Sequence, residues 1–192
     1  MTMVNDKRAQ KVAFVAHCIL NQNAKVNGFA FFPDLIFEML EILHKHHFGL
    51  VQFPCPETSY AGTRRWWYVR EQYDTPAFRK HCQRILVSVL DQLEAYDQAG
   101  YKMVIVGLDG SPSCGVTVSG ASEEWGGPPK ISDEDMKNYP TTKSPGVFME
   151  EVFKAIEQRG IEIPKYTGAG FDMPGFDLKA QVNKLDEFLA KI

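Results

Sequence analysis

The sequence predicts a single α/β domain, residues 1–192, built on a parallel β-sheet of about four strands in the order 2-1-3-4, with helices on both faces. Three observations predict it. Short apolar runs alternate with amphipathic helical segments, and the connections are long enough for the crossovers that parallel strands require. A length of 192 residues, of which 44% are hydrophobic, suits one domain with a full core. No repeat or linker divides the chain, so we expect one Rossmann-like domain.

The expected strands are four short runs rich in Val, Ile or Phe. They cover residues 11–16, 49–53, 102–108 and 161–166. The expected helices carry the residues that typically begin and end helices. They run from 33 to 47, from the pair Thr75-Pro76 to the residue before Gly100, from the pair Ser144-Pro145 to Gly160, and from 177 to about 191. Each strand is therefore followed by a helix.

Two connections are too long to be simple turns. Residues 56–74 follow the second strand, and residues 109–143 follow the third. Loops of this length in a compact domain are usually functional. Both begin at the carboxyl end of a strand, where open α/β sheets bind their ligands. We therefore expect these two loops to form the active site.

Charge and hydropathy disfavour two classes of partner. The formal charge is -3, so no overall positive field attracts a polynucleotide. No segment approaches the roughly 18 apolar residues that a membrane span needs. The apolar run 12–20 is interrupted by His17 and Cys18 and precedes no small-residue cleavage site, so we interpret it as a first strand and not as a signal peptide. We expect a cytoplasmic protein, and a homodimer is compatible with the sequence.

Three of the four cysteines lie at or past the ends of predicted strands. Cys18, Cys55 and Cys114 come after the first, second and third strands, which are neighbours in the order 2-1-3. Because neighbouring strands lie about 4.8 Å apart, we expect the three thiols to converge within about 10 Å. Cys82 falls in the apolar stripe of the long helix, where a thiol serves as a small buried hydrophobe. His17 precedes Cys18 in an extended segment, so we expect its side chain on the opposite face, in the core.

Three thiolates without a histidine at matching spacing suit a soft metal centre. A structural zinc site normally has four protein ligands, whereas three cysteines leave one position of a metal centre open. The absence of a CxxC pair disfavours a zinc ribbon and a thioredoxin-like dithiol. Thiol chemistry without a metal, and small residues with no shared role, remain open as alternatives.

The segments around these cysteines form a set of ordered motifs. Cys-Ile-Leu begins at Cys18, Cys-Pro-Glu begins at Cys55, and Ser-Pro-Ser-Cys-Gly begins at Ser111. In this order of motifs, roughly the first 120 residues resemble the thiouracil desulfidase family. The resemblance implies a 4Fe–4S cluster held by Cys18, Cys55 and Cys114, whose open iron takes sulfur from a small heterocyclic thiocarbonyl substrate. It also implies an acid–base role for Glu57 and a place for the Ser111 hydroxyl beside the substrate.

The chain departs from the family pattern around these motifs, as a divergent member would. The segment NQNAKVNG follows the first motif in place of an Arg-Tyr-Asp-Gly run, and residues 108–110 replace a basic residue that is common there. As substrate contacts we single out Asn21, Ser113, Trp66 and Trp67. The two tryptophans belong to TRRWWYVREQY, and stacking of a heterocycle on such an aromatic plane is worth about 1–3 kcal/mol.

Other interpretations of the same residues remain open. The pocket could hold a nucleotide or a redox-responsive cluster without catalysis, or Cys114 could transfer sulfur without iron. Glu57 and Ser111 could cap local turns. The tryptophan loop could pack on the sheet or form a dimer contact.

Overall fold

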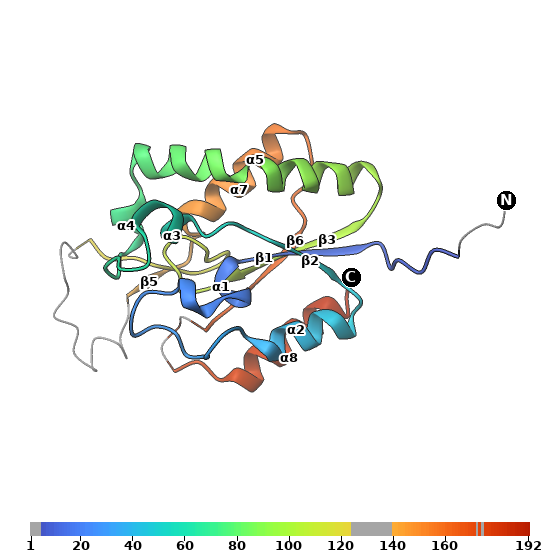
Figure 1. Cartoon of the computed structure of the whole chain (residues 1–192), viewed down its shortest axis with the longest axis horizontal. Coiled ribbons are helices and arrows are strands. Elements are labelled where there is room, and N and C mark those ends of the chain that lie inside the picture. Colours follow the sequence, from blue (N-terminus) through green and yellow to red (C-terminus); the bar gives the residue numbers. More distant parts are fainter. Residues whose placement is uncertain (1–4, 124–139, 172, 174) are drawn as a thin grey trace.

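The computed structural model describes residues 5–123, 140–171, 173 and 175–192, and it has the α/β architecture expected from the sequence (Figure 1). A four-stranded parallel sheet forms its centre, in the order β2-β1-β3-β6. Its strands are β1 (Lys11–Val15), β2 (Gly49–Gln52), β3 (Lys102–Leu108) and β6 (Lys165–Ala169). The predicted order 2-1-3-4 is confirmed, because β6 is the fourth strand of this sheet along the chain.

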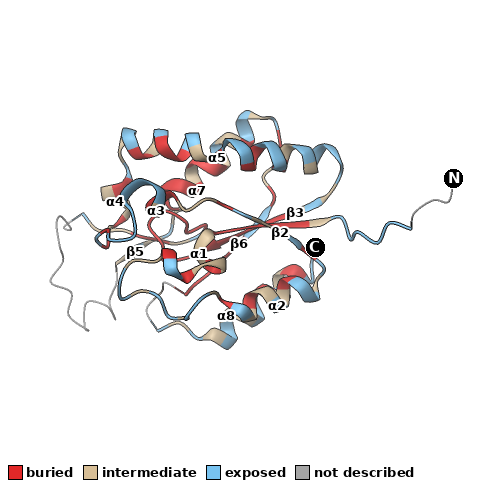
Figure 2. Ribbon diagram, viewed as in Figure 1, coloured by how far each residue is buried: buried red, intermediate tan, exposed pale blue. Residues whose placement is uncertain are grey.

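The two inner strands are buried on both faces. Residues 13–15 of β1 and 104–106 of β3 are fully inaccessible to solvent. Continuous apolar runs of this kind are typical of parallel strands that helices cover on both faces. Figure 2 shows the buried sheet between two layers of helices with exposed outer surfaces. Since β1 pairs with β2 on one side and with β3 on the other, the ends of these three strands lie next to one another.

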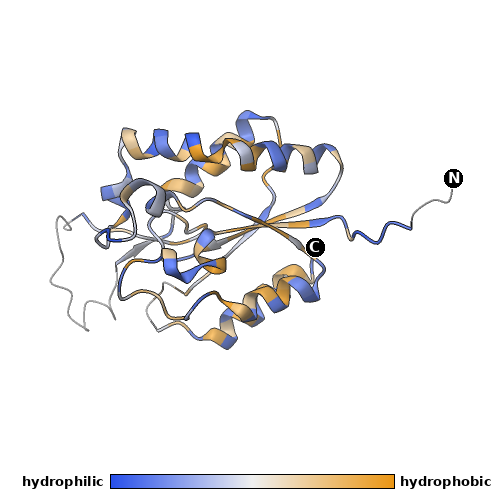
Figure 3. Ribbon diagram, in the orientation of Figure 1, coloured by the Kyte–Doolittle hydropathy of each residue, from blue (hydrophilic) through white to orange (hydrophobic). Residues whose placement is uncertain are grey.

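Four longer helices cover the sheet, two on each face (Figure 1). The first pair is α5 (Pro76–Gln98) with α7 (Val147–Gln158), and the second is α2 (Phe37–Lys45) with α8 (Leu178–Leu189). Each helix turns hydrophobic residues toward the sheet and polar residues outward (Figure 3). Cys82 lies fully buried within α5, as expected for a thiol in its apolar stripe. Of the helices that the structure describes, none is both long and apolar enough to cross a membrane.

The segments that follow the strands contain short elements. They are α1 (His17–Leu20) and the 3-10 helix η1 (Gln22–Ala24) after β1, α3 (Pro56–Ala61) and α4 (Arg70–Tyr73) after β2, and β4 (Ser119–Gly120) and β5 (Thr141–Thr142) after β3. β4 and β5 pair with each other in antiparallel orientation. Of the predicted loop 109–143, residues 124–139 lie outside the described part of the chain.

The fourth strand begins later than the sequence predicted. The predicted range 161–166 was wrong, and the strand is Lys165–Ala169. Ile161 lies just beyond α7, and its N–H donates to the carbonyl of Ile156 in that helix at 3.3 Å. Pro164 has no N–H to contribute to a ladder. The register with β3 therefore starts at Lys165, which pairs with Val104.

The first long helix begins at Phe37, not at residue 33 as predicted. Residues ahead of it form hydrogen bonds with the segment that follows β1. The N–H of Gln22 donates to the carbonyl of Asp34 at 2.6 Å, and the N–H of Ile36 donates to that of Ile19 at 3.0 Å. These tertiary hydrogen bonds compete with the helix for the backbone of 33–36, and they fix the segment that carries the first cysteine.

Candidate functional site

A cavity lies where β1, β2 and β3 end, and three cysteines line it together. Cys18 comes from α1, Cys55 from the position just before α3, and Cys114 from the turn after β3. All four cysteines of the chain are described and are present as thiols, not disulfides. The parallel sheet thus brings three thiols from distant parts of the sequence to one cavity.

Burial controls the ionisation of two of these thiols. The pKa of Cys114 is raised well above its ordinary value, first by burial and then by the neighbouring Cys18 and Cys55. The pKa of Cys55 is raised as well, first by burial and then by Glu57. A buried thiol loses its hydration when it ionises, and a nearby negative charge adds to that cost. Both thiols therefore stay protonated near neutral pH unless a cation compensates their charge.

The donor set of the cavity consists mainly of soft thiols. Among the described residues, no group of three or more His, Cys, Asp or Glu side chains is arranged to hold a metal ion. The three thiols therefore do not form the compact set that one ion requires. A cluster that binds each cysteine through a different iron atom has no such requirement.

The start of α3 fixes the direction of the Cys55 side chain. Cys55 is the N-cap of this helix, with Pro56 at its first position. The Cys55 Sγ accepts a hydrogen bond from the N–H of Thr58 at 3.3 Å and donates to Thr58 Oγ1 at 3.2 Å. The Thr58 hydroxyl donates in turn to the carbonyl of Ala24 at 3.1 Å, and Ala24 also lines the cavity.

The turn after β3 is stabilised by its first serine. Ser111 Oγ accepts hydrogen bonds from the N–H of Cys114 at 3.1 Å and from the N–H of Ser113 at 3.4 Å. Ser111 thus caps the turn, one of the alternatives left open by the sequence. It also lines the cavity, so the same side chain both stabilises the turn and borders the site.

Asp109 fixes the far side of this turn. Its Oδ1 accepts hydrogen bonds from the N–H groups of Val116 and Thr117, both at 3.0 Å, and the Thr117 hydroxyl donates to its Oδ2. Asp109 is 4% exposed, so these donors take the place of the water that its carboxylate would otherwise bind. Asp109 therefore closes the turn from inside the fold.

The amino-terminal end of α7 packs against the same turn. The N–H of Val147 donates to the carbonyl of Pro112, and that of Phe148 donates to the carbonyl of Ser113, each at 3.1 Å. These carbonyls accept hydrogen bonds from the first N–H groups of α7, which have no partner within the helix. A Cβ at Gly146 would lie 2.5 Å from the Ser113 carbonyl, so a glycine permits this close approach.

Glu57 is the buried carboxylate of the cavity. Arg65 Nε donates to its Oε2 at 2.9 Å, and Ser113 Oγ donates to its Oε1 at 2.6 Å. The Glu57 and Arg65 side chains are 11% and 3% exposed, which makes this a buried ion pair. The Ser113 hydroxyl also lies 3.4 Å from Ser111 Oγ and 3.4 Å from Cys114 Sγ. A chain of hydroxyls therefore connects Glu57 with Ser111 and with one of the thiols.

One wall of the cavity is apolar. It is formed by Val26, Phe29, Trp67, Tyr68 and Leu108. The ring centroids of Phe29 and Trp67 are 4.4 Å apart. Trp66, which we had expected beside the substrate, is 58% exposed and does not line the cavity. Trp67, in contrast, is buried and lines the cavity together with Tyr68, so only one of the two tryptophans faces the site.

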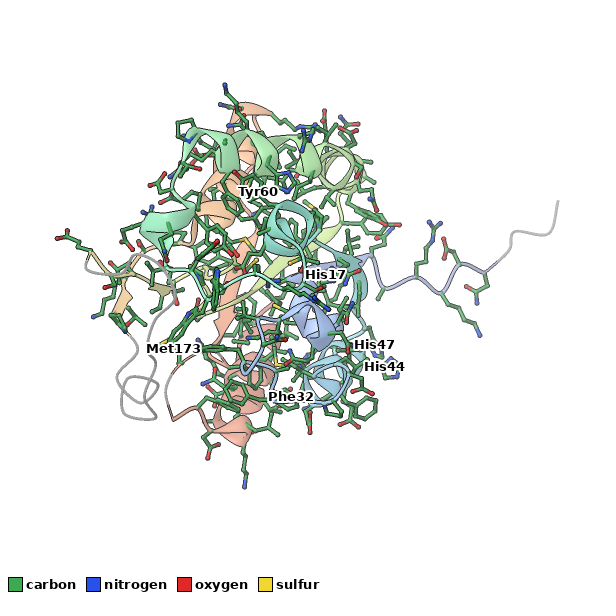
Figure 4. The ribbon with its side chains drawn as sticks, turned by 60° about the vertical axis from the view of Figure 1, so that its left-hand side comes forward. His17, Phe32, His44, His47, Tyr60 and Met173 are labelled. Carbon is green, nitrogen blue, oxygen red and sulfur yellow. The ribbon has the colours of Figure 1, made fainter. Side chains whose placement is uncertain are left out.

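Asn21 and His17 lie at the edge of the site. His17 is the first residue of α1, is half-buried and lines the cavity. The expectation of a core histidine in an extended segment was wrong, because β1 ends at Val15 and a helical turn follows (Figure 4). Asn21 is not among the residues that line the cavity. Its Nδ2 lies 3.5 Å from His17 Nε2, and its Oδ1 accepts a hydrogen bond from the N–H of Asn23 at 3.1 Å.

The uncharacterized protein MJ0003 of Methanocaldococcus jannaschii is 31% identical to this chain over 163 residues, which cover 82% of this chain and 88% of that protein. This chain belongs to the family of that protein. No family model matches the sequence, and no solved structure matches it. The shared length means that the family has most of this domain in common.

Two residues of the site carried no assigned role in the sequence analysis. Asp109 was noted only as a departure from a basic residue, although an aspartate directly after a buried strand is a recognisable signal. Arg65 was considered only as part of an aromatic loop. Its partner Glu57 lies in a different turn, and no periodicity connects the two positions. Only the folded chain reveals that pair.

Proposed function

We propose that this protein is an iron–sulfur enzyme that removes sulfur from a small thiocarbonyl compound, with a 4Fe–4S cluster held by Cys18, Cys55 and Cys114. One observation carries the proposal. The three thiols come from three adjacent strand ends and line one cavity together with Glu57 and Ser111. The resemblance of the three cysteine motifs to those of thiouracil desulfidases points to the same chemistry.

The chemistry of the donor set fits such a cluster. Thiolates are the ligands of iron–sulfur clusters, and three of them leave one iron without a protein ligand. When bound, the cluster supplies this iron as a Lewis acid toward the sulfur of the substrate. Because burial raises the pKa of Cys114 and Cys55, binding of the cluster would displace the protons of these thiols.

The reaction that follows is a hydrolysis. Water adds to the thiocarbonyl carbon, a C–O bond forms, the C–S bond breaks, and the sulfur leaves as hydrogen sulfide with the two protons of the water. No oxidant or reductant is consumed. The residues of this chain have to orient the water and carry its two protons in turn to the sulfur, and both tasks are suited to hydroxyl and carboxylate groups.

Ser111 and Glu57 divide these tasks between them. The Ser111 hydroxyl borders the cavity and orients the water. Glu57 accepts the proton of the water by way of Ser113, whose hydroxyl donates to Glu57 Oε1. The same path delivers this proton to the sulfur, and then the second proton, which the added hydroxyl group loses as the C–S bond breaks. Ser113, which lines the cavity, is thus a proton relay in this proposal and keeps its predicted place beside the substrate.

The apolar wall favours a planar substrate. Phe29 and Trp67 form an aromatic pair, and Leu108 and Val26 complete the wall beside the three thiols. An aromatic surface next to a few convergent polar groups is typical of pockets for small heterocyclic ligands. We therefore propose a small heterocyclic thiocarbonyl compound, with thiouracil as the first compound to test.

Sulfur transfer by a cysteine without iron is less compatible with the site. A reactive cysteine needs a lowered pKa, usually from a nearby positive charge. The pKa values of Cys114 and Cys55 are shifted in the opposite direction, by burial and by neighbouring acidic groups. In the absence of a metal, these thiols are therefore weak nucleophiles.

Anaerobic reconstitution with iron and sulfide tests the proposal. We expect a coloured protein with bound iron and acid-labile sulfide, which releases hydrogen sulfide from thiouracil. Replacing Cys18, Cys55 or Cys114 by serine should abolish iron binding, because each substitution removes one ligand. The matched control is Cys82→Ser, whose thiol is buried in α5 away from the cavity and whose folded protein should keep the iron. A colourless protein without bound iron after reconstitution would refute the proposal.

A further inference from the structure

Arg65 is a buried cation with an unusually complete set of partners. Its Nε donates to Glu57 Oε2 at 2.9 Å, and its Nη2 donates to the carbonyl of Ala24 at 2.8 Å. Its Nη1 donates to the carbonyl of Gly62 at 3.1 Å and to Thr58 Oγ1 at 3.3 Å. The guanidinium can hold several acceptors at once because its donors form a rigid fork, and a lysine could not replace all of them.

These contacts connect three parts of the cavity lining. Ala24 lines the cavity from η1, and Glu57 lines it from α3. Thr58 is the residue that hydrogen-bonds the Cys55 Sγ. Arg65 itself lies two residues before Trp67, the aromatic residue of the apolar wall. A single side chain therefore joins the η1 segment, the cysteine turn and the aromatic wall.

Arg65 also determines how the Glu57 carboxylate is turned. It contacts one carboxylate oxygen, Oε2, and leaves the other, Oε1, to the hydroxyl of Ser113. Ser113 is the only link in the described network between Glu57 and Ser111. If the guanidinium were removed, the carboxylate would lose the partner that fixes this orientation.

We propose that Arg65 is a positioning residue, which acts through Glu57 by holding its carboxylate against Ser113 and which fastens the cysteine turn to the η1 segment. This inference rests on the proposed function for its catalytic consequence. The role proposed for Arg65 differs from that of a purely stabilising ion pair in one respect. A stabilising pair affects how much protein is folded, whereas a positioning residue affects the turnover of the folded protein.

The kinetic test compares Arg65→Gln, Glu57→Gln and the double variant in reconstituted enzyme, with thiouracil as substrate. We expect Arg65→Gln to lower kcat by about 100-fold, the range that a positioned acid–base group contributes, with KM within threefold and the iron content unchanged. The double variant should be no slower than Glu57→Gln alone, because residues that act through one another are not additive. Independent, multiplicative losses, or an unchanged kcat in folded Arg65→Gln, would overturn the proposal.

The neighbouring arginine offers a matched control. Arg64 is exposed and belongs to the same loop, so Arg64→Gln should leave kcat unchanged. If Arg65→Gln does not fold, Arg65→Lys replaces it, and we expect a smaller loss of about tenfold, since lysine keeps the charge without the fork. An unchanged kcat in Arg65→Lys would then count against the proposal.

A second readout separates this inference from the proposed function. In iron-free protein, hydrogen exchange of the backbone amides of α3 can be followed by mass spectrometry. We expect Arg65→Gln to increase the exchange rate at least threefold, because the hydrogen bonds from the guanidinium to Thr58 and to the carbonyl of Gly62 are lost, and Arg64→Gln to leave it unchanged. A wild-type enzyme that releases no sulfide would refute the proposed function alone. An exchange rate that Arg65→Gln leaves unchanged would refute the positioning role.

Discussion

At the residue scale, the space beside Asp109 determines whether the turn that carries Cys114 can form. The Asp109 carboxylate fits against the backbone of β6 at Gly168. A Cβ at that position would lie 1.9–2.1 Å from the three atoms of the Asp109 carboxyl group. No real side chain tolerates such a contact, so Gly168 provides room for the carboxylate. The position of the turn thus depends on a glycine from another strand.

Gly168→Ala is expected to destabilise the protein by about 1–3 kcal/mol, the usual cost of overpacking a buried site. The methyl group displaces Asp109, and the N–H groups of Val116 and Thr117 lose their acceptor. Urea unfolding followed by circular dichroism measures the free energy of unfolding. Gly49→Ala in β2 is the matched control, since its Cβ would meet only the Lys11 carbonyl at 3.7 Å. Equal stability of the two variants would contradict this account.

The residues of the site differ in how far the sequence predicted them. The sequence placed three cysteines at one edge of the sheet, namely Cys18, Cys55 and Cys114. Each of them follows a strand, and the predicted topology makes these three strands neighbours. The sequence could not predict which of Trp66 and Trp67 lines the cavity, because the side chains that a segment turns inward depend on the surface against which it packs. Arg65 could not be paired with Glu57, because no local rule relates a loop arginine to a carboxylate in the preceding turn.

At the scale of secondary structure elements, α5 and α7 are joined by a network of charged side chains. Arg79 of α5 donates to Asp74, Glu150 and Glu151, each at 2.7 Å. The Glu151 side chain is 2% exposed, so it depends strongly on this partner. Because α7 also packs against the turn of the candidate site, this network helps to position the turn.

Arg79→Gln is expected to lower the free energy of unfolding at pH 7 by about 1–3 kcal/mol, because Glu151 loses its closest cationic partner inside the fold. Part of the loss should depend on pH. The pKa of Asp74 lies below its ordinary value of 3.8, chiefly because Arg79 donates a hydrogen bond to it. The contribution of Asp74 is therefore present above pH 3.8 and disappears as the pH falls through its lowered pKa. Urea unfolding at several pH values measures the difference between wild type and variant.

Arg159→Gln is the matched control for that substitution. Arg159 binds Asp91 and Glu94, whose side chains are 62% and 40% exposed. Exposed ion pairs typically contribute at most about 1 kcal/mol. A larger loss of stability for Arg159→Gln than for Arg79→Gln would show that burial of Glu151 is not the deciding factor.

The sequence predicted elements best where their ends are defined locally. α5 begins after Thr75, whose hydroxyl accepts from the N–H of Phe78 at 3.2 Å, and α8 begins after Asp177, whose carboxylate accepts from the N–H of Ala180 at 2.7 Å. Both starts were predicted to within a residue. The start of α2 was displaced because hydrogen bonds to a distant segment decide it. The start of β6 was displaced because Ile161 still bonds to the end of α7 and Pro164 has no N–H for a ladder.

At the scale of the whole molecule, the candidate site brings together segments that follow three different strands of the sheet. Its three thiols belong to the segments after β1, β2 and β3. A ligand bound by all three would cross-link these segments in the folded state only. Any ligand that binds the folded state and not the unfolded state stabilises the fold.

Reconstitution of the cluster is therefore expected to raise the Tm of the wild-type protein by at least several degrees, since metal-site binding contributes directly to folding free energy. Anaerobic differential scanning calorimetry before and after reconstitution measures this shift. Reconstitution should not raise the Tm of Cys114→Ser. The Tm of Cys82→Ser should start lower than that of the wild type but rise by the same amount. An equal rise in all three proteins would indicate that iron binds elsewhere.

The support of the Cys114 turn by α7 and Gly168 has a consequence for the order in which the protein is made. A ribosome synthesises all three cysteines before it reaches the residues that hold this turn in place, at 146–148 and at 168. A nascent chain that ends just after residue 120 would contain all three cysteines of the candidate site. It would lack the start of α7 and Gly168, which hold the Cys114 turn in place. Maturation of the site is thus expected to follow completion of the chain.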